Sequence, residues 1–278
     1  MSQLILNGEY YPVESNQLLS TANRAFLYGD GVFETIKLQN KNLLFWEDHY
    51  TRMINGAKAL SLDCSLISKD ELSASIINLA EKNSLSTARI RIQLWRSPGG
   101  LFTPLNNSVQ YLINASEFTA APLLKKSCFF FDEVPLAYSS ISRYKTCNAL
   151  PYILASIKRK ELEADEMILF NTDGFVSECS SSNIFWIKGE TLCTPSLETG
   201  CIEGIVRKQI LSYAKRIHIK VVEGQYFKED LLHADFVFST NTTGISQLGC
   251  IEGKQFKEKH PLYDQLIESY TKDVSLQG

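Results

Sequence analysis

The sequence predicts an α/β (α+β) protein of two domains. Its 278 residues are enough for two modest domains with a large core. Segments with helical spacing alternate with short strand-like runs along most of the chain. A short stretch with a proline, at 119–126, separates two such sets, as interdomain connections commonly do. We therefore expect an N-terminal domain at 1–118, a linker at 119–126 and a C-terminal domain at 127–278.

Composition and charge argue against several classes of function. The net charge is −3, with 28 Lys and Arg against 31 Asp and Glu, so nothing indicates a nucleic-acid partner. No apolar run approaches the length of a membrane span, and the first residues lack the pattern of a signal peptide. The seven cysteines are scattered and show no zinc-ligand spacing with the histidines. We expect reduced thiols, a cytoplasmic protein and no metal.

The first half of the chain is expected to combine one sheet with two helices. A hairpin at 3–13 turns at Asn7-Gly8, and a strand at 32–38 follows two glycines that flank Asp30. Helices are expected at 43–59 and 69–82, and strands at 88–95 and 109–115.

Two arginines of this half stand where an anion is a natural ligand. His49 and Arg52 share a helix face, either as a surface pair or with Arg52 gripping a phosphate. Arg96 stands at the mouth of a glycine-rich loop, 97–100, which suits an anionic ligand but is also common in plain turns.

The stretch 142–186 organises the second half. Lys145 lies in a polar turn, and a helix follows with an apolar stripe that we expect to be buried, formed by Leu150, Ile153, Leu154 and Ile157. A strand at 167–170, a turn at 171–174 and a second strand that carries Glu178 come next.

Lys145 and Glu178 together indicate a chemistry. Pyridoxal 5′-phosphate (PLP) needs a lysine for its Schiff base, an ion partner for its pyridine nitrogen and donors around its phosphate. The helix and hairpin between the two residues can aim an amine and a carboxylate at one such cofactor. Taken alone, these two residues are better explained as a solvated loop lysine and a surface strand glutamate.

The remainder of the chain offers two further anion-binding signals. A strand at 191–194 precedes Gly204 and a helix at 205–217, whose first backbone N–H groups can bind a phosphate. A strand at 218–223, a helix at 228–233 and a strand at 235–239 lead into the polar turn 240–244. The hydroxyls and amides of that turn suit a phosphate or carboxylate, although ordinary polar turns look the same. A last helix is expected at about 262–272.

In order along the chain, these pieces resemble the class IV aminotransferase (fold-type IV PLP enzyme) family. The resemblance rests on Arg24 with Tyr28-Gly-Asp-Gly-Val-Phe-Glu-Thr35, His49-x-x-Arg52, Lys145-Thr-x-Asn148, Glu178-x-x-x-Ser182-Asn183-Ile184-Phe185, Gly204-Ile205-Val206-Arg207 and Thr240-Asn241-Thr242. It implies a smaller N-terminal α/β domain, a larger C-terminal pseudo-barrel domain, a cofactor in the cleft between them and a homodimer.

The resemblance also implies roles for single residues. Lys145 is expected to form the Schiff base and move protons, and Glu178 to pair with the pyridine nitrogen. The phosphate is expected to bind Arg52, the amides of Ile205 and Val206, and Thr242. Asn183 and Gly204 complete the cofactor-binding set.

Within that family, the sequence is most similar to aminodeoxychorismate lyases. Branched-chain aminotransferases have a tyrosine at the position of Leu150 and a glycine at that of Thr35. D-amino-acid aminotransferases have a tyrosine in place of Phe33 and an Arg-x-His motif in the 97–102 loop. The lyases are similar in the loop that begins at Arg96, in 145–150 and in 178–189. The segment 241–247 departs from them because it lacks their prolines.

The sequence therefore predicts a lyase that converts 4-amino-4-deoxychorismate to 4-aminobenzoate and pyruvate, a step of folate biosynthesis. Lys145 and Thr35 are the expected catalytic residues, and Phe33, Arg96 and Thr243 are expected to contact substrate. Expected partners are a second copy of the chain and, functionally, aminodeoxychorismate synthase. One alternative is an aminotransferase acting on branched-chain or other L-amino acids with 2-oxoglutarate. Another is a binding or structural protein that retains only the fold.

Overall fold

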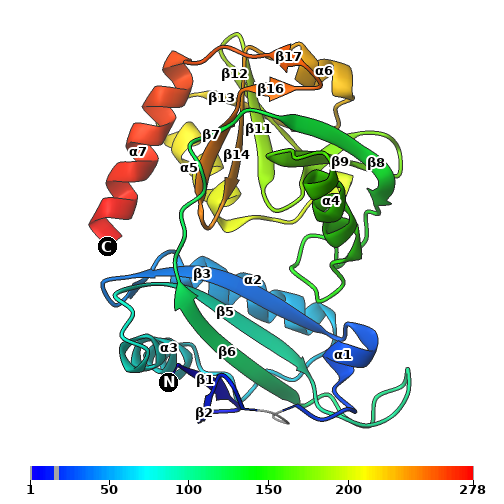
Figure 1. Ribbon diagram of the computed structural model, residues 1–278, viewed down its shortest axis with the longest axis vertical. Coiled ribbons are helices and arrows are strands. Elements are labelled where there is room, and N and C mark those ends of the chain that lie inside the picture. The colour runs from blue at the N-terminus through cyan, green and yellow to red at the C-terminus, as the bar shows by residue number, and fades with distance from the viewer. Residues whose placement is uncertain (1, 16–18, 278) are drawn as a thin grey trace. The chain divides into compact units, whose positions relative to one another are not determined.

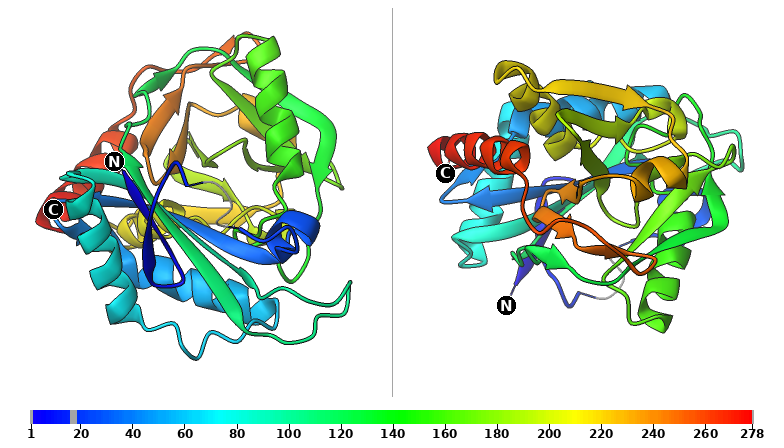
Figure 2. Two further views of the ribbon diagram at one scale, coloured as in Figure 1. Left: turned by 60° about the horizontal axis from the view of Figure 1, so that its bottom comes forward. Right: turned by 90° about the horizontal axis from the view of Figure 1, so that it is seen from above.

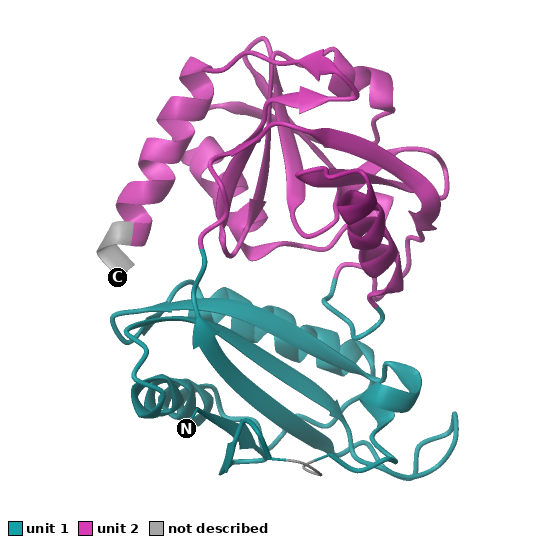
Figure 3. Ribbon diagram, in the orientation of Figure 1, with its two compact units in different colours: residues 1–119, 144–148, 277–278 teal, residues 120–143, 149–276 magenta. Residues whose placement is uncertain are grey.

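A computed structural model describes residues 2–15 and 19–277 of the chain. They form two compact units: unit 1 comprises residues 1–119, 144–148 and 277–278, and unit 2 comprises 120–143 and 149–276 (Figure 3). The segment that contains Lys145 thus belongs to unit 1, whereas the sequence placed it in the second domain. Within the described ranges, no helix is both long and apolar enough to cross a membrane.

Unit 1 is built on one antiparallel sheet of six strands, in the order β2-β1-β6-β5-β3-β4 (Figure 1). The expected hairpin, helices and strands of this half are confirmed within a few residues. The turn at Asn7-Gly8 has positive φ at both residues, as a tight hairpin requires. The elements are β1 (Gln3–Leu6), β2 (Glu9–Pro12), α1 (Arg24–Tyr28), β3 (Gly31–Gln39), β4 (Asn42–Leu43), α2 (Trp46–Ala59), α3 (Lys69–Lys82), β5 (Thr87–Arg96) and β6 (Val109–Glu117).

Helices α2 and α3 cover one face of this sheet (Figure 2, left). Alternate residues of β3 and β5, among them Val32, Ile36 and Ile92, pack against both helices. Because strand side chains alternate between faces, the residues between them point to the other side. Phe33, Thr35 and Arg91 lie on that second face and are half-buried.

Unit 2 contains two sheets, in the orders β10-β9-β8-β16-β17 and β13-β12-β11-β14-β15-β7. The elements of unit 2 are β7 (Leu124–Lys125), β8 (Cys128–Leu136), α4 (Leu150–Glu161), β9 (Glu166–Asn171), β10 (Val176–Cys179), β11 (Asn183–Lys188), β12 (Thr191–Pro195), η1 (Leu197–Thr199), α5 (Ile205–Arg216), β13 (Lys220–Gly224), α6 (Lys228–Leu232), β14 (Phe236–Asn241), β15 (Gly244–Leu248), β16 (Cys250–Ile251), β17 (Lys254–Gln255) and α7 (Pro261–Gln277). Strand β8 was not predicted from the sequence, although it is as long as β3.

Three apolar clusters make unit 2 a layered structure. The two sheets share a core that includes Ile168 and Trp186. Helices α5 and α7 cover the outer face of the six-stranded sheet, where Phe238 packs. Helix α4 covers the outer face of the five-stranded sheet through Ala155. Two facing sheets with helices outside confirm the expected α/β (α+β) architecture.

The prediction that the apolar stripe of α4 is buried is wrong. Leu150, Ile153, Leu154 and Ile157 are 69%, 50%, 42% and 51% exposed. Ala155 is the residue of α4 that is buried, and Tyr152 points to the same side because it is three residues away. The helical spacing was correct, but it marks the face that unit 2 leaves uncovered.

Candidate active site

Lys145 is fixed against the first residues of β3. Its carbonyl oxygen accepts a hydrogen bond from the Phe33 N–H at 2.8 Å, and the Cys147 N–H donates to the Gly31 carbonyl at 2.9 Å. Thr146 forms an isolated antiparallel bridge with Val32 between these bonds. The loop around the lysine is therefore fixed against the start of β3 by backbone hydrogen bonds on both sides of Thr146.

The Gly29-Asp30-Gly31 turn makes that arrangement possible. Gly29 ends α1 with φ +66°, a conformation that favours glycine. Gly31 lies so close to β5 that a Cβ would fall 2.4 Å from the Leu94 carbonyl oxygen. Any side chain at position 31 would therefore separate β3 from β5 just where the Lys145 segment attaches.

The Lys145 side chain lies over Phe33 together with a second cation. Lys145 Nζ is 4.8 Å and Arg91 Cζ is 4.1 Å from the centre of the Phe33 ring. Burial lowers the pKa of Arg91, which still leaves it charged. No carboxylate in residues 2–15 or 19–277 forms an ion pair with this guanidinium. Thr35 is paired with Arg91 across the strands and so faces the same side.

A buried charge cluster supports the opposite face of β3. Arg52 binds Glu34 through Nε and Nη2 at 2.7 and 2.6 Å, and His49 Nδ1 lies 2.8 Å from Glu34 Oε2. Burial alone would raise the pKa of Glu34, but the Arg52 charge and the His49 contact outweigh it and lower this pKa to about 2. The pair His49 and Arg52 is thus buried, not on the surface, and Glu34 uses two of the arginine's nitrogens. The expected phosphate contact of Arg52 stays a prediction.

Arg96 has partners other than the expected substrate. Its five N–H groups donate to Asp30, Asn107 and the carbonyls of Leu60 and Ser61. Asp30 also binds Arg24, and the two guanidiniums lower its pKa against the opposing effect of burial. With all its donors engaged, Arg96 braces the turn before β3 and has none left for a substrate carboxylate.

Glu178 is buried in unit 2, where Tyr152, Ile202 and Asn183 donate hydrogen bonds to it. Its Oε1 accepts from the Tyr152 hydroxyl at 2.7 Å and from the Ile202 N–H at 3.0 Å. Its Oε2 accepts from Asn183 Nδ2 at 3.1 Å. Hydrogen bonds to a carboxylate favour its charged form. Burial and the Glu178 charge raise the pKa of Tyr152 well above its ordinary value, so this phenol remains a donor.

The start of α5 has the features of an anion site. Gly204 is the N-cap residue, and no side chain caps the helix. The Ile205 and Val206 N–H groups are the first of a 12-residue helix, whose dipole favours a negative group there. A Cβ on Gly204 would lie 1.9 Å from Asn183 Oδ1. Asn183 Nδ2 also donates to the Ile202 carbonyl, so Asn183 links this helix start to Glu178.

The polar turn after β14 is tied to the same region. Asn241 Nδ2 donates to the Ser181 carbonyl at 3.0 Å, between Glu178 and Asn183 in the sequence. The backbone N–H and hydroxyl of Thr243 both donate to Asn241 Oδ1. Both hydrogen-bond donors of Thr243 are thus used within the turn. The structure therefore gives no support to the expected contact between Thr243 and a substrate carboxylate. Thr242 lies in this turn and is half-buried.

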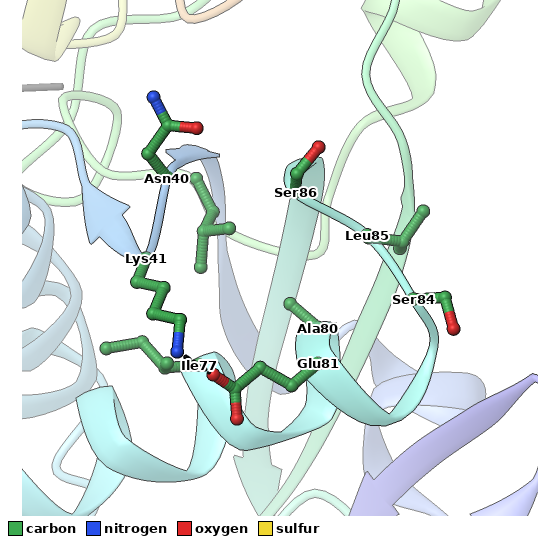
Figure 4. A pocket seen from close by; sticks show the side chains of 9 residues that line it. Asn40, Lys41, Ile77, Ala80, Glu81, Ser84, Leu85 and Ser86 are labelled. Atoms are coloured by element: carbon green, nitrogen blue, oxygen red, sulfur yellow. Dashed lines mark ion pairs between the residues drawn. The ribbon is translucent and has the colours of Figure 1, made fainter.

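Other features of the described residues do not form part of this site. A pocket of about 520 Å³ in unit 1 lies beside the Lys41–Glu81 ion pair, and none of the expected site residues lines it (Figure 4). No group of three or more metal-binding side chains occurs in the described part of the chain. Burial raises the pKa of Cys147 to about 11, so this thiol near Lys145 stays protonated.

Sequence reasoning missed two residues that matter here. Glu34 stands between Val32 and Ile36 on the core side of β3. This alternation could have predicted that the Glu34 carboxylate is buried, and a buried carboxylate requires cationic partners. Tyr152 follows Lys145 by seven residues and gave no signal of its own. Its bond to Glu178 depends on the packing of α4 against the sheet.

Comparison with known proteins identifies the family. The model of the amino-transferase class IV family matches residues 31–248. The chain belongs to that family. A putative branched-chain-amino-acid aminotransferase of Methanocaldococcus jannaschii is 30% identical over 267 residues, covering 92% of this chain and 90% of that protein. The aminodeoxychorismate lyase of Bacillus subtilis is 30% identical over 248 residues, covering 86% and 83%.

Solved structures of class IV enzymes have the same fold. The branched-chain aminotransferase of Escherichia coli superimposes with a TM-score of 0.88 at 25% identity, covering 98% of this chain and 94% of that one. A putative 4-amino-4-deoxychorismate lyase of Legionella pneumophila gives 0.87 at 26% identity, covering 94% and 97%. The expected family and enzyme class are confirmed, and the relatives include both candidate activities.

The residues of this chain fit the PLP on which class IV aminotransferases depend. A half-buried lysine, a buried carboxylate held by neutral donors, and an uncapped helix start match the three parts of the cofactor. Lys145 is the expected Schiff-base lysine, Glu178 the expected partner of the pyridine nitrogen, and the N–H groups of Ile205 and Val206 the expected phosphate donors. The fit supports the expected cofactor.

Proposed function

We propose that this enzyme is a 4-amino-4-deoxychorismate lyase that releases 4-aminobenzoate and pyruvate. The observation that carries the proposal is the face of unit 1 on which Thr35 and Arg91 pair across β3 and β5, beside Phe33 and Lys145. An amine, a hydroxyl and an unpaired cation on one face suit an elimination from an anionic substrate. The 30% identity to the Bacillus subtilis lyase gives independent support.

Each residue then has one task in the elimination. When bound, PLP supplies an electron sink for the negative charge that develops at the carbon bearing the substrate amine. Lys145 Nζ removes the proton from that carbon. The bond from the neighbouring carbon to the enolpyruvyl oxygen breaks, and the Thr35 hydroxyl donates a proton to this oxygen. The proton taken up by Lys145 passes through solvent to Thr35, which restores both side chains. The released enol tautomerises to pyruvate, and the six-membered ring becomes aromatic.

Several residues are proposed to bind the cofactor. Glu178 pairs with the pyridine nitrogen, and Tyr152 and Asn183 orient its carboxylate. The amides of Ile205 and Val206 bind the phosphate together with Arg52 and Thr242. These contacts are proposals drawn from the family pattern and from the local geometry of each unit.

Arg91 takes the role that the sequence gave to Arg96. The substrate carries carboxylates, and a guanidinium binds a carboxylate through two parallel hydrogen bonds. Arg91 lies over Phe33 on the Lys145 face and forms no ion pair with a described carboxylate, whereas every N–H of Arg96 is engaged. Phe33 provides the apolar surface between Arg91 and Lys145.

A second candidate activity is transamination between L-amino acids and 2-oxoglutarate. It is favoured by the 30% identity to the putative branched-chain aminotransferase, which spans 92% of this chain. Arg91 suits this reaction as well, because 2-oxoglutarate carries a distal carboxylate. Thr35 does not have its proposed task in this reaction, since there is no enolpyruvyl oxygen to protonate.

A product assay separates the two activities. PLP-loaded enzyme is mixed with enzymatically prepared aminodeoxychorismate, and 4-aminobenzoate and pyruvate are measured. A parallel sample contains L-leucine and 2-oxoglutarate, and glutamate is measured. We expect equal amounts of 4-aminobenzoate and pyruvate with little glutamate. Glutamate without 4-aminobenzoate would establish the aminotransferase instead.

The variant Thr35→Val sharpens this assay. Valine has nearly the volume of threonine but no hydroxyl, so binding should persist while turnover of aminodeoxychorismate falls by about 100-fold. Thr35→Ser keeps the hydroxyl and is the matched control. Equal turnover in all three proteins would remove Thr35 from the reaction.

The exposed face of α4 supports the expected homodimer. Four large aliphatic side chains gather there, at 42–69% exposure, which is typical of an interface and not of a solvated helix. We propose that this face contacts a second copy. Sedimentation should give a dimer for the natural chain and a monomer for Ile153→Glu/Ile157→Glu; a monomeric natural chain would refute the proposal.

The folate pathway, the functional link to aminodeoxychorismate synthase and a cytoplasmic location are parts of the lyase proposal and depend on its outcome.

A further inference from the structure

A buried ion pair in unit 2 has no part in the chemistry proposed above. Lys125 Nζ lies 2.6 Å from Glu166 Oε2, and their side chains are 9% and 2% exposed. Lys125 belongs to the short strand β7, and Glu166 begins β9. The two residues are 41 positions apart in the sequence, so the pair joins separate parts of the unit.

Glu166 fixes the turn that joins two proposed cofactor residues. Its Oε1 accepts from the backbone N–H of Ser180 at 3.2 Å and from the Ser180 hydroxyl at 2.5 Å. Its Oε2 accepts from the Ser182 hydroxyl at 3.4 Å. Ser180 and Ser182 stand between Glu178 and Asn183. One buried carboxylate therefore holds the whole connection from β10 to β11.

Lys125 extends this network to the second anion-binding turn. Its Nζ lies 3.3 Å from the hydroxyl oxygen of Ser239 in β14. Two residues later, Asn241 donates to the Ser181 carbonyl. The turn with Thr242 and the turn after Glu178 are thus connected twice, once through Asn241 and once through the ion pair.

Stability is a poor explanation for such a pair. Removing two charges from water is costly, and buried ion pairs can often be replaced by apolar residues without loss of stability. A fully hydrogen-bonded network does, however, restrict the groups around it to one geometry. Lys125 and Glu166 together contact three serines, and all three lie within two residues of a proposed cofactor residue or its turn.

We propose that Lys125 and Glu166 are positioning residues for the cofactor. They hold the Glu178 carboxylate against the pyridine nitrogen and set the Thr242 turn beside the phosphate. This inference rests on the proposed contact between Glu178 and the pyridine nitrogen. It adds a function for two residues that touch neither cofactor nor substrate.

The double variant Lys125→Met/Glu166→Leu separates positioning from stability. It removes both charges together and keeps an apolar pair of similar volume, although the donors of Ser180 and Ser182 lose their acceptor. Its stability in urea should therefore lie between that of the natural chain and that of a variant with one unpaired buried charge. The single variant Lys125→Met leaves a buried charge and should be less stable. We expect kcat of the PLP-loaded double variant to fall by about tenfold, because the carboxylate loses its fixed position. If the double variant had both the kcat and the stability of the natural enzyme, the proposal would be overturned.

The absorption spectrum of the PLP-loaded enzyme gives a second readout. A less firmly held Glu178 carboxylate stabilises the protonated pyridine nitrogen less. The ring then withdraws fewer electrons from the Schiff base, so the Schiff-base pKa, read as the pH midpoint of the visible absorption band, should rise in the double variant. Lys257→Met is the control, because Lys257 pairs with Asp235 in the same unit at the surface, where it is 61% exposed. It should leave both midpoint and kcat unchanged. The same midpoint in the double variant and the natural enzyme would refute positioning.

Glu178→Gln distinguishes this proposal from the one on which it rests. If Glu178→Gln raises the midpoint and the double variant does not, only the positioning role fails. If Glu178→Gln leaves the midpoint unchanged, the contact between Glu178 and the pyridine nitrogen fails, and the positioning role falls with it. If both variants raise it, a triple variant should show no further rise beyond Glu178→Gln.

Discussion

Replacing Glu34 with Gln should destabilise unit 1 strongly. The substitution keeps the shape of the side chain but removes the charge that Arg52 and His49 share. Arg52 would then be a buried cation without its bidentate partner, and breaking such a pair costs about 3–5 kcal/mol. The pKa gives a similar figure: a fall from the ordinary 4.5 to about 2 corresponds to about 3 kcal/mol at about 1.4 kcal/mol per pH unit.

The same pKa predicts how stability depends on pH. The folded pKa of Glu34 is below its unfolded value, so its contribution is complete above about pH 4.5 and is lost as the pH falls toward about 2. The pKa of His49 is lowered by burial, which also reduces stability on acidification. In the Glu34→Gln variant, the Glu34 part of this loss should disappear.

Urea unfolding of the cofactor-free protein at pH 7 and pH 4 tests this reasoning. Tryptophan fluorescence reports mainly on unit 1, which contains Trp46 and Trp95. Glu47→Gln is the matched control, because Glu47 pairs with Lys69 at the surface, and such pairs contribute about 0–1 kcal/mol. If Glu34→Gln costs no more than Glu47→Gln, the buried cluster does not stabilise unit 1 as described.

Three further variants test single contacts of the site. Arg91→Leu should raise KM for the carboxylate substrate at least about tenfold with little change in kcat, and Arg91→Lys should recover part of it; an unchanged KM would exclude Arg91 from the substrate site. Tyr152→Phe removes a hydrogen bond to the Glu178 carboxylate and should lower kcat by about tenfold, with the fold retained by circular dichroism. Gly204→Ala would place a Cβ 1.9 Å from Asn183 Oδ1, so the Asn183 side chain or the helix start must shift and the Kd for PLP should rise; equal PLP titrations would contradict this.

Much of the fold could be predicted from local patterns. Helix α3 begins and ends where its periodicity and the Ser68 cap indicate, and β3 and β5 extend the predicted strands by one or two residues. These elements follow from alternation and capping, which are local properties. β8 was missed because its pairing with β9 is parallel and distant, and its mixed Phe and acidic residues give no simple alternation.

Residues of the candidate site could be predicted only where a sequence motif also meets a chemical requirement of the cofactor. Lys145 and Glu178 could be chosen because one cofactor demands an amine and a carboxylate. Arg96 was assigned to substrate because a glycine-rich loop follows it, but its five donors meet Asp30, Asn107 and two carbonyls brought together by the fold. Arg91 looked like an ordinary strand residue, since its place over Phe33 arises from the pairing of β3 with β5, two strands that are far apart in the sequence.

The lysine itself is open to the most direct test. PLP-loaded enzyme is reduced with borohydride, digested, and the modified peptide located by mass spectrometry, with Lys145→Ala as the control. We predict a single phosphopyridoxyl group on Lys145, none in the variant, and no 4-aminobenzoate from the variant. A label on another lysine, or full turnover by Lys145→Ala, would contradict the proposed active site.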